Sequence, residues 1–340
     1  KMRIAHISTN KVVWIEEDEA ADQYTAWPFW TPDSKELFYQ VLNRGQDDLQ
    51  ILSANTSTGK NRLVYEEKSK TLVDFFEDIH FLKNKSGFIL RSQADGNDHI
   101  YLFDMNGKLK KQLTKGEWNV GNIILVDEEN SRVYFDGNKD NMVDNQLYVV
   151  GFDGGKITAL TKISGTHKTS VSPNGKYFYD THSDINTPGK LDIYDNNGEL
   201  IRNLGNSKAK EFDEYKLGKA ELFYIQTDDG INLPAMWVLP PNFNPNKKYP
   251  VLFAVYGAPG FVGVRNSFSG YLDRYFLSQS DIIYFEVDHR GSGYFGGKGK
   301  DFAHRNLGKW EINDYSEAVK WLRTKPFVDS TKIGITGGSY

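Results

Sequence analysis

One segment pattern recurs through the first two thirds of the chain. Each copy is a polar turn that runs into an apolar or alternating strand: "TPDSKELFY" from Thr31, "LKNKSGFIL" from Leu82, "DEENSRVYF" from Asp127 and "SPNGKYFYD" from Ser172. Successive copies begin 51, 45 and 45 residues apart. This period limits the fold more than any other feature, because a repeat of about 40–50 residues with four strands is typical of a β-propeller blade.

A second repeated element, a strand, a turn and a strand, alternates with the first. Glycine or asparagine is expected at its turn, because these residues tolerate positive φ in hairpins. We therefore expect a partial β-propeller of four to five blades over residues 1–210, with a β-sandwich or a β-solenoid as the alternative. Since an open ring exposes sheet edges, further blades are expected upstream of residue 1. The predicted turn residues are Asn10, Gly59, Gly107, Gly155 and Gly198.

Composition agrees with many short strands and excludes several classes of protein. Aromatic residues make up 14% of the chain, which suits β-structure. The net charge of −4 gives no basic field for nucleic acid, and the lack of cysteine excludes disulfides, thiolate metal sites and a cysteine nucleophile. No apolar run approaches the roughly 18 residues of a membrane span. The first ten residues lack the apolar core of a signal peptide.

The last third of the chain has a different pattern of apolar residues. A charged connector over 204–220 leads to a predicted hairpin with Asp229 and Gly230 at its turn. Continuous apolar runs at 251–257 and 281–288 predict buried strands, and "KIGIT" predicts a third. Helices are expected in "SGYLDRYFLSQ" and in "INDYSEAVKWLRTKP", whose apolar face is Tyr315, Ala318, Val319 and Leu322. Alternating strands and helices predict a mainly parallel sheet. The motifs described next assign residues 211–340 to part of an α/β-hydrolase domain.

The chain's last residues favour a nucleophile elbow. In α/β-hydrolases a strand runs into a sharp turn whose apex is the serine of G-x-S-x-G. Gly337, Gly338, Ser339 and Tyr340 supply the first four positions directly after the predicted strand "KIGIT". "VYGAPG" follows the first buried strand, where these enzymes place an oxyanion donor, and "DHRGSGYFG" follows the second.

These motifs, in this order behind a propeller, resemble the dipeptidyl peptidase IV family of serine peptidases, within the prolyl oligopeptidase group. The resemblance is dense over 250–340, in "VYGAPG", "DHRGSGYFGG", "LGKWEINDYSEAVKWL" and "GGSY". It is diffuse over the blades, where "TKGEWNV" after "HIYLF" also matches. The chain departs from the family's common pattern at Gly338 and His289.

The resemblance implies roles for particular residues. Ser339 matches the nucleophile. The backbone N–H of Tyr340 would be one oxyanion-hole donor, and its ring would line the substrate pocket for a proline-like side chain. Tyr256 matches the tyrosine whose hydroxyl is the other donor; taken without the family, it reads as a buried tyrosine at a strand end. Arg290 is expected to hold its loop by pairing with a carboxylate such as Asp288 or Asp314.

A serine nucleophile needs a base and a group that orients the base. In this fold the order is Ser, Asp, His, so both partners are expected beyond residue 340. All seven histidines precede Ser339 and are read as blade, loop or surface residues: 6, 80, 99, 167, 182, 289 and 304. The pairs Glu16–Glu17 and Glu66–Glu67 are read as surface residues rather than as the family's amine-binding glutamates. No metal cluster, cofactor or nucleotide motif is expected.

The sequence therefore predicts a serine exopeptidase that releases a short N-terminal peptide after proline or alanine. An oligopeptidase or an acylaminoacyl peptidase of the same fold is an alternative. A non-catalytic propeller that binds a partner is another, from a different class. The expected partners are peptide substrates, with a homodimer of the parent protein implied by the resemblance. The resemblance also implies a periplasmic or secreted protein.

Overall fold

The computed structural model describes residues 1–268 and 277–340. Most of the helix predicted in "SGYLDRYFLSQ" lies outside the described residues. The chain forms two compact units, which are described separately below. Unit 1 comprises residues 1–116, 126–133 and 150–157, and unit 2 comprises residues 117–125, 134–149 and 158–340.

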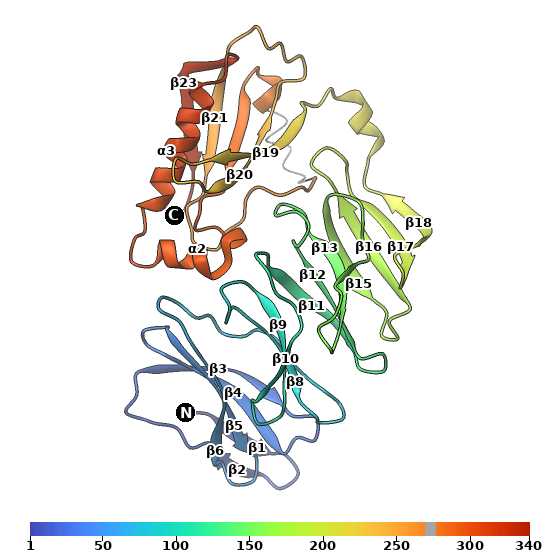
Figure 1. The fold of residues 1–340 in the computed structure, drawn as a ribbon, viewed down its shortest axis with the longest axis vertical. Helices are drawn as coiled ribbons and strands as arrows, with labels where there is room; N and C mark the ends of the chain where they lie inside the picture. The colour runs from blue at the N-terminus through green and yellow to red at the C-terminus, as the bar shows by residue number, and fades with distance from the viewer. Residues whose placement is uncertain (269–276) are drawn as a thin grey trace. The chain divides into compact units, whose positions relative to one another are not determined.

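Four sheets of four strands follow a two-stranded ribbon, and in each sheet the strands are neighbours in chain order (Figure 1). The ribbon is β1 (Arg3–His6) and β2 (Lys11–Trp14). The strands of the four sheets, in order, are β3 (Gln23–Trp30), β4 (Glu36–Asn43), β5 (Asp48–Asn55) and β6 (Asn61–Lys68); β7 (Ile79–Phe81), β8 (Phe88–Ser92), β9 (His99–Phe103) and β10 (Leu109–Gln112); β11 (Val120–Asp127), β12 (Arg132–Gly137), β13 (Gln146–Gly151) and β14 (Thr158–Ala159); and β15 (Thr166–Val171), β16 (Tyr177–Ser183), β17 (Lys190–Asp195) and β18 (Leu200–Asn206).

The turn between the last two strands of each sheet contains a residue with positive φ. The predicted residues Gly59, Gly107 and Gly198 have φ of 77°, 83° and 80°, and Asn10 in the ribbon has 51°. In the third sheet the prediction of Gly155 is wrong by one residue, because Gly154 has the positive φ, at 66°. Because "DGGK" contains two adjacent glycines, the sequence pattern alone does not show which of them has the positive φ.

These turn glycines also lie close to the preceding sheet. A Cβ atom on Gly107 would lie 1.6 Å from the carbonyl oxygen of Val64, in β6, and one on Gly59 would lie 2.0 Å from that of Trp14, in β2. Only glycine fits at such a contact. The repeated glycine therefore serves both the turn and the approach of one sheet to the next.

Consecutive sheets pack face to face within each unit. In unit 1, Phe38 and Leu49 of the β3–β6 sheet share one buried cluster with Phe88 and Leu90 of the β7–β10 sheet. In unit 2, the β11–β14 and β15–β18 sheets meet through a second cluster, formed by Tyr134, Leu147, Leu160, Phe178 and Tyr194. Sheets of four strands stacked in chain order are blades of a β-propeller.

A five-stranded mixed sheet follows the blades in unit 2, in the order β19-β20-β22-β21-β23. Its strands β21, β22 and β23 are parallel, whereas β20 runs antiparallel to both β19 and β22. The chain is therefore a set of propeller blades followed by part of an α/β-hydrolase domain, as predicted. The strands are β19 (Ala220–Gln226), β20 (Asn232–Val238), β21 (Tyr249–Val255), β22 (Ile283–Val287) and β23 (Val328–Gly337).

Helix α3 (Trp310–Arg323) packs along one face of this sheet (Figure 1). Its residues Tyr315, Ala318 and Leu322 are buried in one cluster with Phe253 and Phe285, while Val319 is partly buried against it. The predicted apolar face of this helix is thus confirmed. The other helical segments are η1 (Lys210–Glu214), η2 (Gly293–Phe295) and α2 (Gly296–Ala303).

Among the described residues, no helix has the length and apolar character needed to cross a membrane. The change from blades to mixed sheet falls between the end of β18 at Asn206 and the start of β19 at Ala220. The domain boundary at residue 210 stays a prediction.

Candidate active site at the ends of strands β21 and β23

Two parallel strands bring the predicted site residues together. Strands β21 and β23 are neighbours, and their last register pair is Val255 and Gly337. Tyr256 follows the first strand by one residue, and Ser339 follows the second by two. Because the carboxyl ends of adjacent parallel strands lie at one edge of a sheet, both residues leave the sheet at the same place.

The backbone at Ser339 has the conformation that an elbow requires. Its φ is 70°, in the left-handed region that a residue with a Cβ atom rarely adopts, and its side chain is exposed. Such a residue costs of order 1–3 kcal/mol and persists only where the surroundings impose it. A Cβ atom on Gly337 would lie 2.7 Å from the carbonyl oxygen of Val255, so glycine is needed where the turn begins. Strand β23 is thus followed by a serine whose backbone has the left-handed conformation of a nucleophile elbow.

The side chain of Tyr340 is held from two sides. Its ring lies over Gly257, where an added Cβ atom would come within 2.8 Å of two ring carbons. Its hydroxyl donates a hydrogen bond to Oε1 of Glu311 at 2.9 Å. Burial, followed by the effect of Glu311, raises the pKa of Tyr340. Glu311 is itself buried and accepts a bond from the N–H of Gly308 at 3.1 Å, so the phenol has a fixed anchor.

Tyr256 directly precedes the glycine on which the Tyr340 ring lies. It is partly buried, and its ring meets that of Phe261 edge to face at 4.6 Å between centroids. Gly257 contacts the ring of Tyr340, the residue that follows Ser339. Tyr256 is therefore the direct sequence neighbour of a residue that contacts this end of the chain. Its role as an oxyanion donor stays a prediction.

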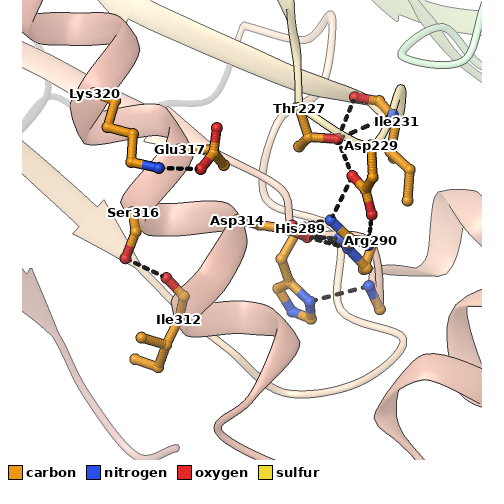
Figure 2. Close-up of polar contacts among 11 residues, drawn as sticks. Thr227, Asp229, Ile231, His289, Arg290, Ile312, Asp314, Ser316, Glu317 and Lys320 are labelled. Atoms are coloured by element: carbon orange, nitrogen blue, oxygen red, sulfur yellow. Dashed lines mark hydrogen bonds and ion pairs between the residues drawn. The ribbon is translucent and has the colours of Figure 1, made fainter.

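Arg290 is a buried side chain at the centre of an ionic network (Figure 2). The prediction that it pairs with a carboxylate is confirmed for Asp314: its Nη2 and Nε donate to Oδ1 of Asp314 at 2.7 and 2.9 Å. Its Nη1 donates to Oδ2 of Asp229 at 2.6 Å, and this bond is the main reason that the pKa of Asp229 falls to about 2. The guanidinium also stacks on Trp310, 4.5 Å from the ring centroid.

Asp288 was the other carboxylate predicted to pair with Arg290, but the hydrogen bonds of Arg290 go to Asp314 and Asp229. The two oxygens of Asp288 accept hydrogen bonds from the N–H groups of Gly263 and Val264 at 2.8 and 3.0 Å. Burial raises the pKa of Asp288 to about 7, although both N–H groups favour its ionised form. Asp288 therefore fixes the loop that follows Tyr256.

His289 is buried beside this network. Its Nδ1 accepts a bond from the N–H of Gly291 at 3.1 Å, and its ring meets Tyr315 edge to face. Burial lowers the pKa of His289. These contacts agree with its interpretation as a loop residue.

Two residues of the site were not predicted. Asp229 was interpreted only as a hairpin turn residue, yet it binds Arg290, 61 positions away. Glu311 anchors Tyr340 from a helix 29 positions earlier. Neither contact leaves a periodic signal in the sequence. The acidic residue in the first turn of a helix, just after "LGKW", was the only available hint.

Taken together, the blades, the partly parallel sheet and the serine on a strained turn define a propeller joined to an α/β-hydrolase sheet. Comparison with known families agrees with this class. Residues 1–189 match the model of the dipeptidyl peptidase IV N-terminal region, and residues 266–340 match that of the prolyl oligopeptidase family. The chain belongs to the dipeptidyl peptidase IV family.

Individual relatives point the same way. The chain is 31% identical to dipeptidyl peptidase 4 of Trichophyton equinum, over 98% of this chain and 44% of the relative. It is 29% identical to dipeptidyl peptidase 4 of Arthroderma otae, over 95% of this chain and 43% of the relative. The crystal structure of Porphyromonas gingivalis dipeptidyl peptidase 4 superposes with a TM-score of 0.91 at 26% identity, covering 98% of this chain and 48% of that one. The chain thus spans under half the length of these relatives.

Proposed function

We propose that this chain belongs to a serine exopeptidase in which Ser339 is the nucleophile. The observation that carries the proposal is the backbone of Ser339, which has a φ of 70° two residues after the end of β23. This conformation holds the hydroxyl out of the sheet, where a substrate carbonyl can approach it. Attack would give an acyl-enzyme that water then hydrolyses.

Two neighbours are suited to stabilise the charge that forms on the carbonyl oxygen during this attack. The N–H of Tyr340 follows the nucleophile directly, and Tyr256 leaves the adjacent strand end. We assign these two groups to the oxyanion hole. Glu311 acts through Tyr340: by holding the phenol it fixes the peptide that carries the N–H. The Tyr340 ring would then line the pocket for the residue before the scissile bond.

Ser339 also needs a general base and an aspartate that orients the base. We assign both to a part of the longer protein that follows residue 340, which the length of the relatives supports. The propeller blades would restrict access to short or unfolded peptides.

The proposed substrate is the free N-terminus of a peptide with proline or alanine at its second position. The release of a dipeptide rests on the relatives that are named dipeptidyl peptidase 4, and the preference for proline or alanine rests on the resemblance to the family. An oligopeptidase or an acylaminoacyl peptidase would use the same Ser339 chemistry on other substrates. A homodimer of the longer protein is implied only by the resemblance to the family, and we include it in this proposal.

A panel of chromogenic substrates on the full-length protein tests the proposal. We expect kcat/KM for Gly-Pro and Ala-Ala dipeptidyl substrates to exceed that for tripeptidyl, N-acylated and internal-peptide substrates by at least about tenfold. Preference for N-acylated or internal substrates would reassign the specificity and keep the nucleophile. Absence of hydrolysis of every substrate would favour a binding module.

A further inference from the structure

Four ionisable side chains meet on one face of the β15–β18 blade, away from the strand ends discussed above. His167 on β15 is the register partner of His182 on β16, and Asp180 on β16 is the register partner of Asp192 on β17. Because alternate residues of a strand share a face, Asp180 and His182 point the same way. All four are buried, and Asp180 has no exposed surface. We call these four residues the His167 cluster.

The contacts of His167 require a cation inside the cluster. Its Nε2 lies 2.8 Å from the carbonyl oxygen of Ile163, which can only accept, so Nε2 carries a hydrogen. Its Nδ1 lies 2.6 Å from Oδ2 of Asp180, which as a carboxylate also only accepts. If the imidazole of His167 were neutral, the lone pair of its Nδ1 would face a lone pair on Oδ2 of Asp180. Either a proton or a metal ion must therefore lie between them.

A proton on Nδ1 of His167 would satisfy its contact with Asp180 but would leave Oδ1 of Asp180 without a partner among the described residues. Nδ1 of His182 lies 3.2 Å from Oδ2 of Asp180 and 3.8 Å from Oδ2 of Asp192. A proton on Nδ1 of His182 would pair it with Oδ2 of Asp180, but among residues 1–268 and 277–340 no hydrogen-bond partner reaches Oδ1 of Asp180. Buried polar atoms without a partner are rare in folded proteins and call for a specific explanation.

We propose that the His167 cluster is a structural site for a divalent transition-metal ion, with Zn²⁺ as the best match. His167 and His182 would each bind through Nδ1, Asp180 would bind through a carboxylate oxygen, and Asp192 is the nearest candidate for a fourth ligand. Two imidazoles and two carboxylates balance the charge of a divalent ion. They are also among the ligands that zinc takes in four-coordinate sites.

The surroundings of the cluster support this assignment. Histidines that bind metals almost always donate their other ring N–H to a carbonyl or carboxylate, as Nε2 of His167 does to Ile163. Asp192 is oriented by Nδ2 of Asn203 at 2.6 Å. The candidate ligand atoms of His167, Asp180 and His182 all lie within 4.8 Å of one another.

Metal binding would require a small movement of side chains. Bonds of about 2.0–2.1 Å in a tetrahedral site separate ligand atoms by roughly 3.3 Å. The 3.2 Å between His182 and Asp180 already matches this spacing, while the 2.6 Å between His167 and Asp180 must widen. The bound ion would cross-link β15 and β16, and it would also link β17 if Asp192 binds. This site lies on the same face of the blade as Phe178 and Tyr194, at its polar end.

Metal content of the full-length protein, after chelation and dialysis against Zn²⁺, tests this site. The comparison is among the wild type, His182→Gln and a matched control, His80→Gln. His80 lies on β7, and its Nε2 is 3.9 Å from Oδ2 of Asp78. We expect the wild type and His80→Gln to retain one more equivalent of zinc than His182→Gln, and zinc to raise the Tm of the first two only.

Equal zinc in the wild type and His182→Gln, or no zinc in the wild type, would overturn the proposal and leave a proton as the cation of the cluster. If His182→Gln does not fold, Co²⁺ bound to the wild type decides. Visible absorption typical of tetrahedral Co²⁺ with nitrogen and oxygen ligands supports the site, and its absence rejects it.

Discussion

The turn at Ser339 and the network around Arg290 lie in the same mixed-sheet region, yet they are built in opposite ways. Arg290 has no exposed side-chain surface and binds two carboxylates, Asp314 and Asp229. Ser339 is exposed, and its distinguishing feature is a φ of 70°. The buried guanidinium is thus paired with carboxylates, and it joins the turn between β19 and β20 to helix α3.

This contrast shows that buried charge alone does not identify a reactive site. The guanidinium of Arg290 stacks on Trp310 and Phe302 and donates from all three of its nitrogens to carboxylates, so the lowered pKa of Asp229 reflects a structural ion pair. A serine on a strained turn has few contacts of its own and depends on glycines and on the register of β21 and β23. We therefore expect changes at Arg290 to reduce stability and changes around Ser339 to reduce the rate of catalysis.

The largest effect on stability is expected for Arg290→Met. Methionine keeps the length of the side chain but leaves the carboxylate of Asp314 buried without a cation, which typically costs about 3–5 kcal/mol. Chemical denaturation of the full-length protein would measure this loss. Arg323→Met, at the exposed end of α3, is the matched control and should change stability by less than about 0.5 kcal/mol. Equal effects of the two substitutions would remove the structural role given to Arg290.

Tyr256→Phe should act on the rate and leave stability nearly unchanged. Removing one oxyanion-hole donor lowers kcat by about 10²–10³, equivalent to roughly 3–4 kcal/mol of transition-state stabilisation. Steady-state kinetics beside a thermal melt would separate the two effects. Tyr224→Phe, an exposed tyrosine of β19, provides the control. A loss of less than about threefold in kcat would return Tyr256 to the role of a partly buried tyrosine at a strand end.

Asp229→Asn should give a smaller, pH-dependent loss of stability. The pKa of Asp229 falls from 3.8 to about 2 in the folded chain, chiefly through its bond to Arg290. The unfolded state therefore binds more protons between these values, so the stabilisation is complete above about pH 4 and disappears as the pH falls through about 2. We expect a loss of about 1–2 kcal/mol at pH 7, at the low end for a hydrogen bond between charged groups, because the side chain of Asp229 is half exposed and solvent screens the pair.

Urea unfolding of the wild type, Asp229→Asn and Asp228→Asn from pH 7 downwards would measure this effect. The neighbouring Asp228 is also exposed and provides the matched control. A difference between the wild type and Asp229→Asn that stays constant down to pH 2 would contradict the assigned ion pair.

Local sequence signals predicted more of the fold than of the contacts around the site. The blade period, the turns at Gly59 and Gly107, and the apolar face of α3 all follow from local pattern, and the structure confirms them. The error at Gly155 arose where two adjacent glycines satisfied the same pattern. The partners of Arg290 were predicted only in part, because bonds to residues 24 and 61 positions away depend on how strands and helix are placed.

The His167 cluster is a second case in which local sequence signals did not predict a contact between distant residues. His167 and His182 were interpreted separately as blade residues, because 15 positions separate them in sequence. Only the register of β15 against β16 places them opposite each other. Metal sites assembled across strands have no compact spacing motif, so the pairing of strands must be known before such a site can be proposed.

Labelling of the full-length protein with a fluorophosphonate probe tests the central claim most directly, because the probe forms a covalent bond with an activated serine. Peptide mapping should place the label on Ser339, and Ser339→Ala should abolish it. Ser316→Ala, at an exposed serine of α3 whose hydroxyl donates to the carbonyl of Ile312, should leave labelling unchanged. Undiminished labelling of the Ser339→Ala protein, or a label found on another serine, would contradict the account.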